Sequence, residues 1–282
     1  MPTDREQADL TREMRWDGAP QPVFPKPTAP QKIGMGLRGA ALLGTTFALT
    51  PFVLLFQLIE RWLPGSTSRR IIRFWAHTCL RLCGLKLIRK GQPMQGPGAI
   101  VANHTGYLDI FTHLAADDVY FVSTADVRHW PLVGPFSTLV RPVYIERRRT
   151  AAKAQETQLR ERLLMGHRLA FFPEGTSTDG RRVLPFKSSL FSVFFHEDLA
   201  DAQIQPVTLA YKPPSHLPPD TYGWWGTKGL GDHISTLLAL SRQGAVEVTF
   251  HPPLAVAGSK SRKNLAALAW QATAEGLPSN AT

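Results

Sequence analysis

Short apolar segments alternate with helix-like stretches from about residue 85 onward, and this alternation constrains the fold more than any other feature. The apolar segments have the length and composition of strands: LKLIRKG, GAIVAN, VYFVSTA, PVYIE, RLAFFPE, QPVTLAYK and VEVTFHP. Helical periodicity is found at 107–116, 127–139, 150–165, 187–199 and 262–275. The pattern predicts an α/β domain with a largely parallel sheet and flanking helices.

A long apolar run precedes this domain. Residues 39–59, GAALLGTTFALTPFVLLFQLI, carry no charged side chain, and the run is about as long as a helix that crosses a bilayer core. Its threonines, Pro51 and Gln57 lower the apolarity. A membrane anchor is favoured, as a spanning helix or a hairpin in one leaflet, and a buried core helix is the alternative. No small-residue cleavage site follows, so a cleavable signal peptide is not expected.

Basic residues are denser after the apolar run than before it. They are Arg61, Arg69, Arg70 and Arg73 after the run, and Lys26, Lys32 and Arg38 before it. The positive-inside tendency therefore predicts an inner (cytoplasmic) membrane protein whose C-terminal domain faces the cytoplasm. Residues 69–84 have a cationic line and an apolar line at helical spacing. This helix either lies on anionic lipid with Trp75 at the interface or packs as a solvated helix of the domain.

The chain divides into three predicted parts. Residues 1–30 contain six prolines and few aliphatic side chains, which predicts a disordered tail. Residues 31–84 are expected to form membrane-anchoring or interfacial helices, and residues 85–282 the α/β domain. Within that domain, Pro213–Asp232 is too rich in proline and glycine for a helix. The tryptophans of this loop, Trp224 and Trp225, either line an apolar groove, touch a membrane interface or pack within the loop.

The only cysteines, Cys79 and Cys83, stand four positions apart with His77 nearby. A structural zinc site needs four converging ligands, which these residues do not supply. We therefore expect packed free thiols in a reducing compartment, and no metal or cofactor.

A His-x-x-x-x-Asp spacing occurs three times, at His104–Asp109, His113–Asp118 and His196–Asp201. The second and third copies fall in predicted helices, where five residues turn by about 500° and hold the two side chains roughly 140° apart. The first copy instead follows a strand and precedes a helix, with Gly106 in the turn between them. Asp109 can therefore reach the imidazole of His104, fix its tautomer and leave the other nitrogen as a base. An N-capping aspartate beside a loop histidine is the alternative.

Two further strand ends carry polar residues. RLAFFPEGTSTDG delivers Glu174, Gly175 and Thr176, with Lys187 shortly after, and PVYIERRR delivers Arg147. Because open α/β sheets place their ligand crevices at the carboxyl ends of strands, we expect these side chains to meet the histidine at one edge. A base beside cationic groups suits transfer of a group to a hydroxyl of an anionic molecule.

Four stretches resemble, in order, the conserved blocks of the glycerolipid acyltransferases: NHTGYLD, PVYIER, FPEGTSTDG with LPFKSSLF, and IQPVTLAY. That family includes 1-acylglycerol-3-phosphate and lyso-ornithine lipid acyltransferases, and the resemblance covers roughly residues 70–212. It implies a membrane-bound O-acyltransferase of the EC 2.3.1 type. Its donor would be a thioester of acyl carrier protein or coenzyme A, its acceptor the hydroxyl of a lysolipid, and its other partner an anionic membrane surface.

The resemblance also implies roles for individual residues. His104 would deprotonate the acceptor hydroxyl, and Asp109 would orient His104. The expected substrate-binding residues are Arg147 for the anionic head group, Glu174, Gly175, Thr176 and Lys187 around the acceptor, and Pro206 at the cleft.

At one position the sequence differs from the family members that act on phosphate-bearing acceptors. Those usually read Glu-Gly-Thr-Arg-Ser, whereas this chain reads EGTST, with Ser177 in place of the arginine. Serine cannot replace a bidentate guanidinium clamp, although Lys187 or Arg181 can compensate. Lyso-ornithine lipid and 1-acylglycerol-3-phosphate therefore both stay open as acceptors.

Other functions fit less of the sequence. A serine hydrolase needs a Gly-x-Ser-x-Gly elbow, which is absent. A nucleic-acid binder would explain the net charge of +10, but the basic residues cluster beside an apolar segment and no recognition motif is present. The remaining alternative is a non-catalytic module that binds anionic lipid and keeps its membrane affinity without His104.

Overall fold

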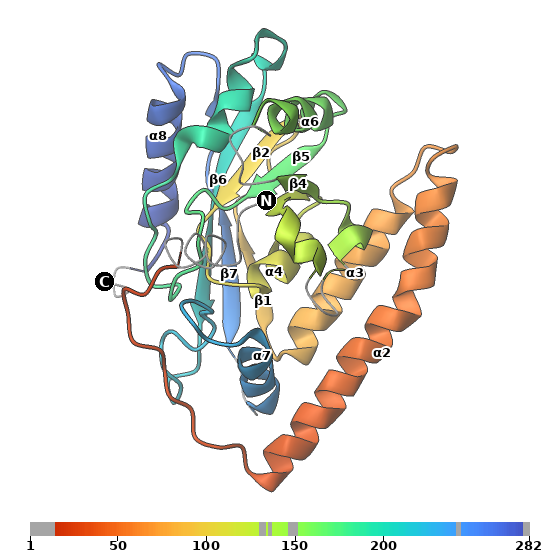
Figure 1. Cartoon of the computed structure of the whole chain (residues 1–282), viewed down its shortest axis with the longest axis vertical. Helices are drawn as coiled ribbons and strands as arrows, with labels where there is room; N and C mark the ends of the chain where they lie inside the picture. Colours follow the sequence, from red (N-terminus) through yellow and green to blue (C-terminus); the bar gives the residue numbers. More distant parts are fainter. Residues whose placement is uncertain (1–14, 130–133, 135–136, 146–151, 241–243, 279–282) are drawn as a thin grey trace, which may run out of the picture.

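The computed structural model describes residues 15–129, 134, 137–145, 152–240 and 244–278 (Figure 1). Its centre is an eight-stranded sheet in the order β1-β7-β6-β2-β5-β3-β4, with β8 paired to β6. The strands are β1 Lys86–Lys90, β2 Gly98–Ala102, β3 Tyr120–Thr124, β4 Val143–Ile145, β5 Arg168–Phe171, β6 Gln203–Lys212, β7 Ala245–Phe250 and β8 Leu254–Ala255. The predicted strands are all present, and β8 is an addition.

The sheet is parallel over most of its width. Strands β2 to β6 run in one direction, whereas β7 and β8 are antiparallel to β6, and β1 runs parallel to β7. The predicted α/β fold with a largely parallel sheet is therefore confirmed, with an antiparallel margin at one side. The carboxyl ends of β2, β5 and β6 lie next to one another at one edge, which is the edge that bears the candidate site.

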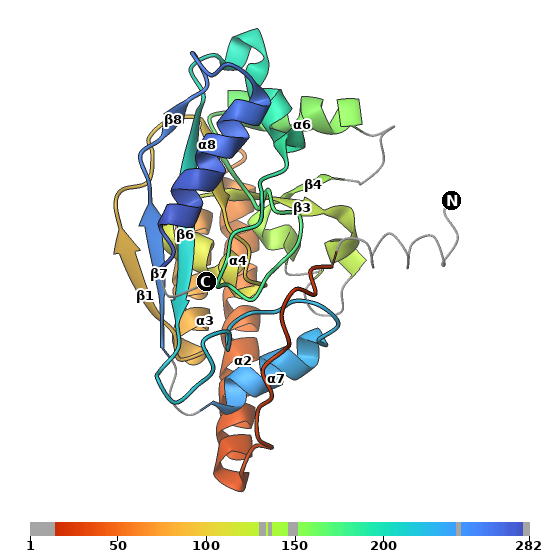
Figure 2. The same cartoon turned by 90° about the vertical axis from the view of Figure 1, so that its left-hand side faces the viewer.

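Helices cover both faces of the sheet. One face packs against α3 (Thr67–Leu82), α4 (Leu108–Ala116) and α7 (Leu230–Ala239), and the other against α6 (Ala152–Leu164) and α8 (Arg262–Glu275). Figures 1 and 2 show α3 and α8 on opposite sides. Strand β2 shows the cause, because Ile100 and Ala102 enter one core while Ala99 and Val101 enter the other. A strand buried on both faces explains why GAIVA is apolar throughout.

The long helix α2 (Ala29–Ile59) runs beside α3, and their connection is tied by Glu60. Its carboxylate accepts hydrogen bonds from the Ser68 backbone N–H (2.8 Å) and the Ser68 hydroxyl (2.5 Å). The N–H groups in the first turn of a helix have no partner within the helix, and a negative charge is favourable there. Glu60 thus joins the end of α2 to the start of α3.

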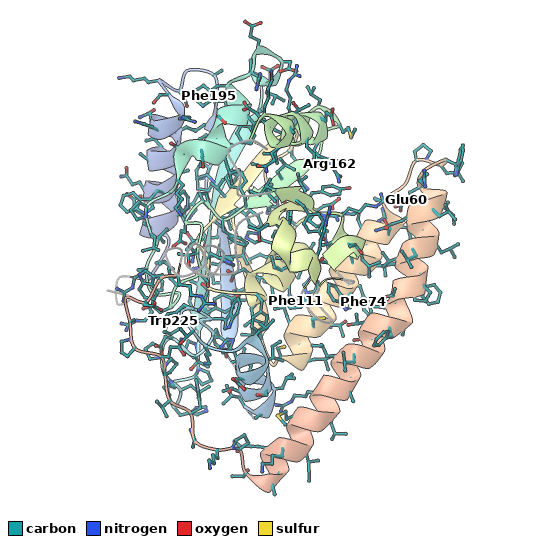
Figure 3. All side chains as sticks on the ribbon, viewed as in Figure 1. Glu60, Phe74, Phe111, Arg162, Phe195 and Trp225 are labelled. Atoms are coloured by element: carbon teal, nitrogen blue, oxygen red, sulfur yellow. The ribbon has the colours of Figure 1, made fainter. Side chains whose placement is uncertain are left out.

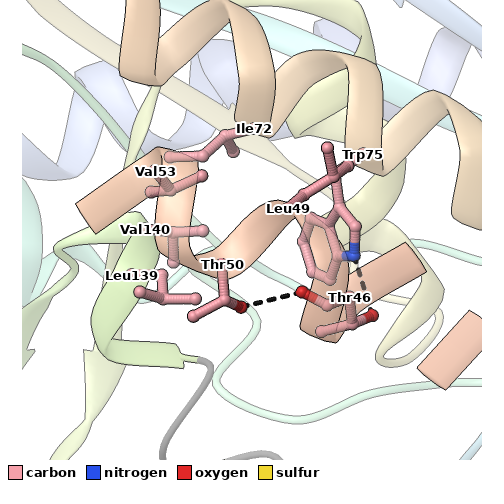
Figure 4. Close-up of a pocket in the computed structure, with 8 residues that line it drawn as sticks. All are labelled: Thr46, Leu49, Thr50, Val53, Ile72, Trp75, Leu139 and Val140. Atoms are coloured by element: carbon pink, nitrogen blue, oxygen red, sulfur yellow. Dashed lines mark hydrogen bonds between the residues drawn. The ribbon is translucent and has the colours of Figure 1, made fainter. Parts of the chain in front are cut away.

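An apolar pocket lies between α2, α3 and the residues Leu139 and Val140 (Figure 4). At its rim the indole N–H of Trp75 donates to the Thr46 hydroxyl (2.9 Å), and the Thr50 hydroxyl donates to the Thr46 carbonyl (2.8 Å). Val53 and Ile72 are buried where the helices touch. Trp75 is therefore held between helices, and α3 packs as a helix of the domain.

Helix α2 remains largely uncovered. Within the described residues it is the one helix long and apolar enough to cross a membrane, and 17% of its most apolar window is buried. Its exposed large side chains include Phe47, Phe52, Leu54, Leu55 and Leu58. So little burial does not fit a core helix.

Three helix predictions need correction. The segment 187–199 forms two 3-10 helices, Ser188–Phe195 and Glu197–Leu199, because burial of Phe191 and Phe194 follows a three-residue turn. The predicted helix 127–139 is replaced at its two ends by 3-10 turns, Ala125–His129 and Thr138–Val140. Residues 134 and 137 are helical, and 130–133 and 135–136 lie outside the described residues. Helix α7 was not expected and begins inside the predicted loop.

The loop that carries Trp224 and Trp225 (the tryptophan loop) packs against residues 15–28; Trp225 is labelled in Figure 3. Trp225 is 3% exposed, and its indole N–H donates to the Ala19 carbonyl (3.1 Å). The Gln21 side chain donates to the Trp225 carbonyl (2.7 Å). Trp225 therefore packs against residues 15–28, outside the loop, whereas the Trp224 indole N–H donates within the loop to the Lys228 carbonyl (2.9 Å). The tail prediction for residues 1–14 lies outside the described residues, whereas 15–28 make ordered contacts.

Candidate active site

The histidine and aspartate of the first copy meet at the end of β2. His104 follows the strand, and Asp109 lies in the first turn of α4. The His104 Nδ1 atom lies 2.7 Å from the Asp109 Oδ2 atom. The turn between them passes so close to Trp224 that a Cβ at Gly106 would lie 3.0 Å from the Trp224 Cβ. A glycine therefore lets the chain fold back and bring the pair together.

The Asp109 carboxylate is fully buried and surrounded by donors. Its Oδ2 atom accepts hydrogen bonds from the backbone N–H groups of Thr105 (2.7 Å) and Gly106 (3.0 Å) as well as facing the imidazole. Donors of this kind favour the ionised carboxylate. An ionised carboxylate accepts only, so the His104 Nδ1 carries the proton and donates. The imidazole therefore presents an unprotonated Nε2.

The opposite side of the imidazole reaches solvent. The His104 side chain is 23% exposed, and among the described residues no hydrogen-bond partner lies on its Nε2 atom. Its ring stacks on Phe172, with 4.1 Å between centroids and 11° between planes. The stack and the aspartate together hold the ring in one orientation.

Backbone contacts hold the turn itself. The Asn103 side chain donates to the Leu209 carbonyl (3.0 Å) and accepts from the Leu209 N–H (2.8 Å), which extends the pairing of β2 with β6 by one residue. The His104 carbonyl accepts from the Thr178 N–H (2.9 Å), and the Thr105 carbonyl accepts from the Trp224 N–H (2.9 Å). Three distant segments thus position the histidine.

Glu174 supports this turn from the end of β5. It is 2% exposed and accepts from the backbone N–H groups of His104 (2.7 Å) and Leu184 (2.9 Å). Burial raises the pKa of this carboxyl group to about 8, against the opposing effect of the two N–H groups. Each of its oxygens accepts from a backbone N–H group, so the carboxyl group holds the His104 backbone, and its expected role at the acceptor site stays a prediction.

The remaining predicted site residues lie in the loop after β5, inside β6 or outside the described residues. Gly175 has a left-handed backbone (φ +74°), and a Cβ there would lie 2.6 Å from the Lys187 Nζ atom, so these two residues are neighbours. Thr176 is half-buried in the same loop. Pro206 is buried inside β6, opposite Val101 of β2. Arg147 lies outside the described residues.

Ser177 has an internal partner. Its hydroxyl donates to the Trp224 carbonyl at 2.5 Å, so its proton is used within the protein. The position that holds an arginine in phosphate-binding members thus ties the Glu174 loop to the tryptophan loop.

The other two His–Asp copies are not joined. His113 is buried in α4, and burial lowers its pKa to about 4. Asp118 lies beyond the end of this helix and pairs with Arg69 (2.5 Å). His196 lies between the two 3-10 helices, so the helical-turn argument does not apply to it, and its Nε2 atom contacts Glu156 (2.8 Å).

The cysteines are buried in or beside α3. Burial raises the pKa of the Cys79 thiol to about 12 and that of the Cys83 thiol to about 11. Thiols with these pKa values are neither ligands nor nucleophiles at neutral pH. Within the described part of the chain, no three histidine, cysteine, aspartate or glutamate side chains converge as a metal site.

Four contacts escaped the sequence analysis: those of Asn103, Phe172, Trp224 and Tyr211, whose hydroxyl lies 2.9 Å from the Asp109 Oδ1 atom. Asn103 and Phe172 are the first residues of the blocks NHTGYLD and FPEGTSTDG, so their position was a usable signal. Tyr211 is the last residue of the block IQPVTLAY, but nothing along the chain connects it with Asp109, which lies 102 positions away.

An oriented histidine with a free ring nitrogen, at the carboxyl edge of a largely parallel sheet, suits proton removal from a hydroxyl. A family model described as Acyltransferase matches residues 83–210, which include this turn, the Glu174 loop and most of β6. The chain belongs to this acyltransferase family and is an acyltransferase.

Individual relatives carry more specific names than the family. The chain is 42% identical to a lyso-ornithine lipid O-acyltransferase of Rhodobacter capsulatus, over 95% of this chain and 98% of that protein. It is 34% identical to a protein of the same name from Brucella abortus, over 80% and 87% of the two chains. The crystal structure of the 1-acyl-sn-glycerophosphate acyltransferase PlsC from Thermotoga maritima superposes with a TM-score of 0.61 at 19% identity, covering 88% of this chain and 93% of that one. That structure confirms the fold.

Proposed function

We propose that the chain transfers a fatty acyl group from a thioester to the free hydroxyl of a lysolipid, with His104 as the general base. The observation that carries the proposal is the 2.7 Å contact between the His104 Nδ1 and Asp109 Oδ2 atoms. It leaves the Nε2 atom unprotonated on a ring that reaches solvent.

The reaction follows from this arrangement. The His104 Nε2 atom accepts the hydroxyl proton while the hydroxyl oxygen attacks the thioester carbonyl carbon. The carbon–sulfur bond then breaks, and the leaving thiolate takes the proton from the imidazolium, which yields an ester and a free thiol. Asp109 stabilises the imidazolium between these steps. A positioned general base commonly contributes about 10²–10⁴ in rate.

We assign lyso-ornithine lipid as the acceptor in preference to 1-acylglycerol-3-phosphate. Two relatives that span most of the chain carry that name. The Ser177 hydroxyl, bonded to the Trp224 carbonyl, offers a phosphate neither a cation nor a free proton. Gly175, Thr176 and Lys187 are the proposed acceptor-side residues near the histidine, and Arg147 remains a proposed head-group ligand.

The proposed donor is an acyl group on acyl carrier protein or coenzyme A. Both carriers are anionic, and the net charge of +10 supports an encounter that weakens with added salt. The exposed apolar face of α2 supports attachment to a membrane. The denser basic residues after the apolar run support an inner-membrane location with the α/β domain on the cytoplasmic side. In this proposal residues 31–84 serve as the anchoring part, although α3 also contributes Ile72, Ala76 and Leu80 to the core of the domain.

The test is an acyl-transfer assay on membranes that contain the full chain. Lyso-ornithine lipid and 1-acylglycerol-3-phosphate are offered together, and the products are identified by mass. We expect acylated ornithine lipid to predominate, and we expect His104→Ala to lower kcat by about 10²–10⁴ because the base is lost.

The matched control is His196→Ala, because His196 is exposed and pairs only with Glu156 among the described residues. His113 is a poorer control, since its ring packs against Phe172, on which His104 stacks. Full activity in His104→Ala would overturn the general base. Lipid binding without transfer by the unaltered chain would indicate the non-catalytic module instead.

A further inference from the structure

The two oxygens of the Asp109 carboxylate have different surroundings. Oδ2 accepts from the His104 ring and from two backbone N–H groups. Oδ1 accepts from the Tyr211 hydroxyl (2.9 Å), its one partner among the described residues. Because Asp109 is fully buried, an oxygen without this donor would lose its hydrogen bond with no water to replace it.

The direction of this hydrogen bond is set by its neighbours. An ionised carboxylate can only accept, so the Tyr211 phenol donates its proton to Asp109. Burial, together with the Asp109 charge, raises the pKa of Tyr211 well above its ordinary value, so the phenol keeps that proton. Because the phenol proton goes to Asp109, the Thr112 hydroxyl is the donor to the phenol oxygen (3.2 Å), and it shares its one proton between that oxygen and the Leu108 carbonyl (3.0 Å).

Tyr211 is held by the same strand that fixes the histidine turn. It lies on β6, two residues after Leu209, whose backbone N–H and carbonyl pair with the Asn103 side chain. Its ring packs against Tyr222, with 5.6 Å between centroids. A rigid central strand therefore determines where the phenol points.

We propose that Tyr211 is a positioning residue for the His104–Asp109 pair, and this inference rests on the proposed role of His104 as general base. The phenol holds the Oδ1 atom, which prevents the carboxylate from rotating about its Cβ–Cγ bond. The Oδ2 atom then stays in line with the His104 N–H, and the Nε2 atom stays aimed at the acceptor hydroxyl. Tyr211 itself touches neither substrate nor reacting atom.

The test compares Tyr211→Phe with Tyr222→Phe in the full chain, in membranes. Each change removes one phenolic hydroxyl from one of two packed rings, and the Tyr222 hydroxyl accepts from the Gly244 N–H, away from Asp109. The measurements are kcat, the KM for the acceptor, the pH profile of kcat/KM and the melting temperature.

We expect Tyr211→Phe to lower kcat by about tenfold to a hundredfold, the effect of losing one hydrogen bond to a charged group, with the acceptor KM unchanged. We also expect the acid limb of the pH profile to move to higher pH. The Asp109 charge is then no longer shared with the phenol and holds the protonated imidazole more tightly. Tyr222→Phe should change neither.

Two results would overturn the inference: an unchanged kcat and acid limb in Tyr211→Phe, or equal losses in both variants with equal falls in melting temperature. If Tyr211→Phe does not fold, Thr112→Val decides. This change removes the hydroxyl next to the phenol, and we expect kcat to fall by about twofold to fivefold. An unchanged kcat in Thr112→Val would contradict the inference. The His104→Ala assay tests the general base separately. Retained activity in that variant would overturn the role of His104, whatever the result for Tyr211→Phe.

Discussion

Two buried carboxylates lie beside the His104 turn and behave differently: Asp109 is in the first turn of α4, and Glu174 follows β5. Asp109 accepts four hydrogen bonds, which favours its ionised form. Glu174 accepts two, and burial raises its pKa to about 8. One group orients the histidine ring, whereas the other holds the histidine backbone. At the scale of single residues, the number of donors separates the two roles.

The raised pKa of Glu174 predicts how stability depends on pH. The folded chain holds a proton that the unfolded chain releases, since the ordinary value for this group is 4.5. Its contribution to the free energy of unfolding is therefore complete below about pH 4.5 and is lost as the pH rises through about 8.

We expect Glu174→Gln to remove this pH dependence. The amide nitrogen would face a backbone N–H, which costs about 1–3 kcal/mol at low pH. Melting temperatures in detergent at several pH values between 4.5 and 8 measure the effect, and the gap between the two proteins should narrow toward the upper limit. The exposed Glu197→Gln is the control. A gap that stays constant with pH would contradict the assignment.

At the scale of elements, adjacent strands carry the site. Strands β2 and β5 deliver His104 and Glu174, and β6 delivers Tyr211. The pairing of these strands brings the residues together, although they lie far apart in sequence. Helix α2 has no such internal role, because most of its apolar side chains are exposed.

The exposed face of α2 predicts membrane attachment that depends on its leucines. Replacing Leu54, Leu55 and Leu58 together with serine should weaken binding to phospholipid vesicles by at least about tenfold, since each buried leucine contributes roughly 1.5–3 kcal/mol. Cosedimentation with vesicles measures this. The same three positions changed to isoleucine form the control. Undiminished binding of the serine variant would show that another surface attaches the chain.

At the scale of the molecule, residues 15–28 link helix α2 to the site. They begin beside the tryptophan loop, where Ala19 and Gln21 bond to Trp225, and end at the start of α2. The neighbouring Trp224 donates its N–H to the carbonyl of Thr105, next to the histidine. The N-terminal segment thus supports the turn indirectly.

This connection predicts the effect of truncation. A chain that begins at residue 23 lacks the contacts with Trp225, and we expect its kcat to fall by about threefold to tenfold because the histidine turn loses support. Vesicle binding should persist, since α2 is retained. A chain that begins at residue 15 keeps both contacts and is the control. Equal kcat in the two truncated chains would show that the segment does not act on the site.

Much of this architecture was predictable from short-range patterns. Apolar runs predicted β1 to β7, and a glycine-containing turn after a strand singled out His104 among the histidines. Both signals lie within a few residues along the chain, where periodicity and turn chemistry act. The segment 187–199 shows the limit of such patterns, because a buried 3-10 helix and an α-helix share the same apolar content.

The sequence by itself determined strands β1 to β7, helices α4, α6 and α8, and the histidine turn, since each depends on neighbours along the chain. Only the tertiary structure decided that Glu174 points at the backbone of His104, 70 positions away, that Asn103 pairs with Leu209, and that Tyr211 reaches Asp109. These contacts depend on the order in which the strands pair. That order arises from burial of both faces of the whole sheet, and no local pattern encodes it.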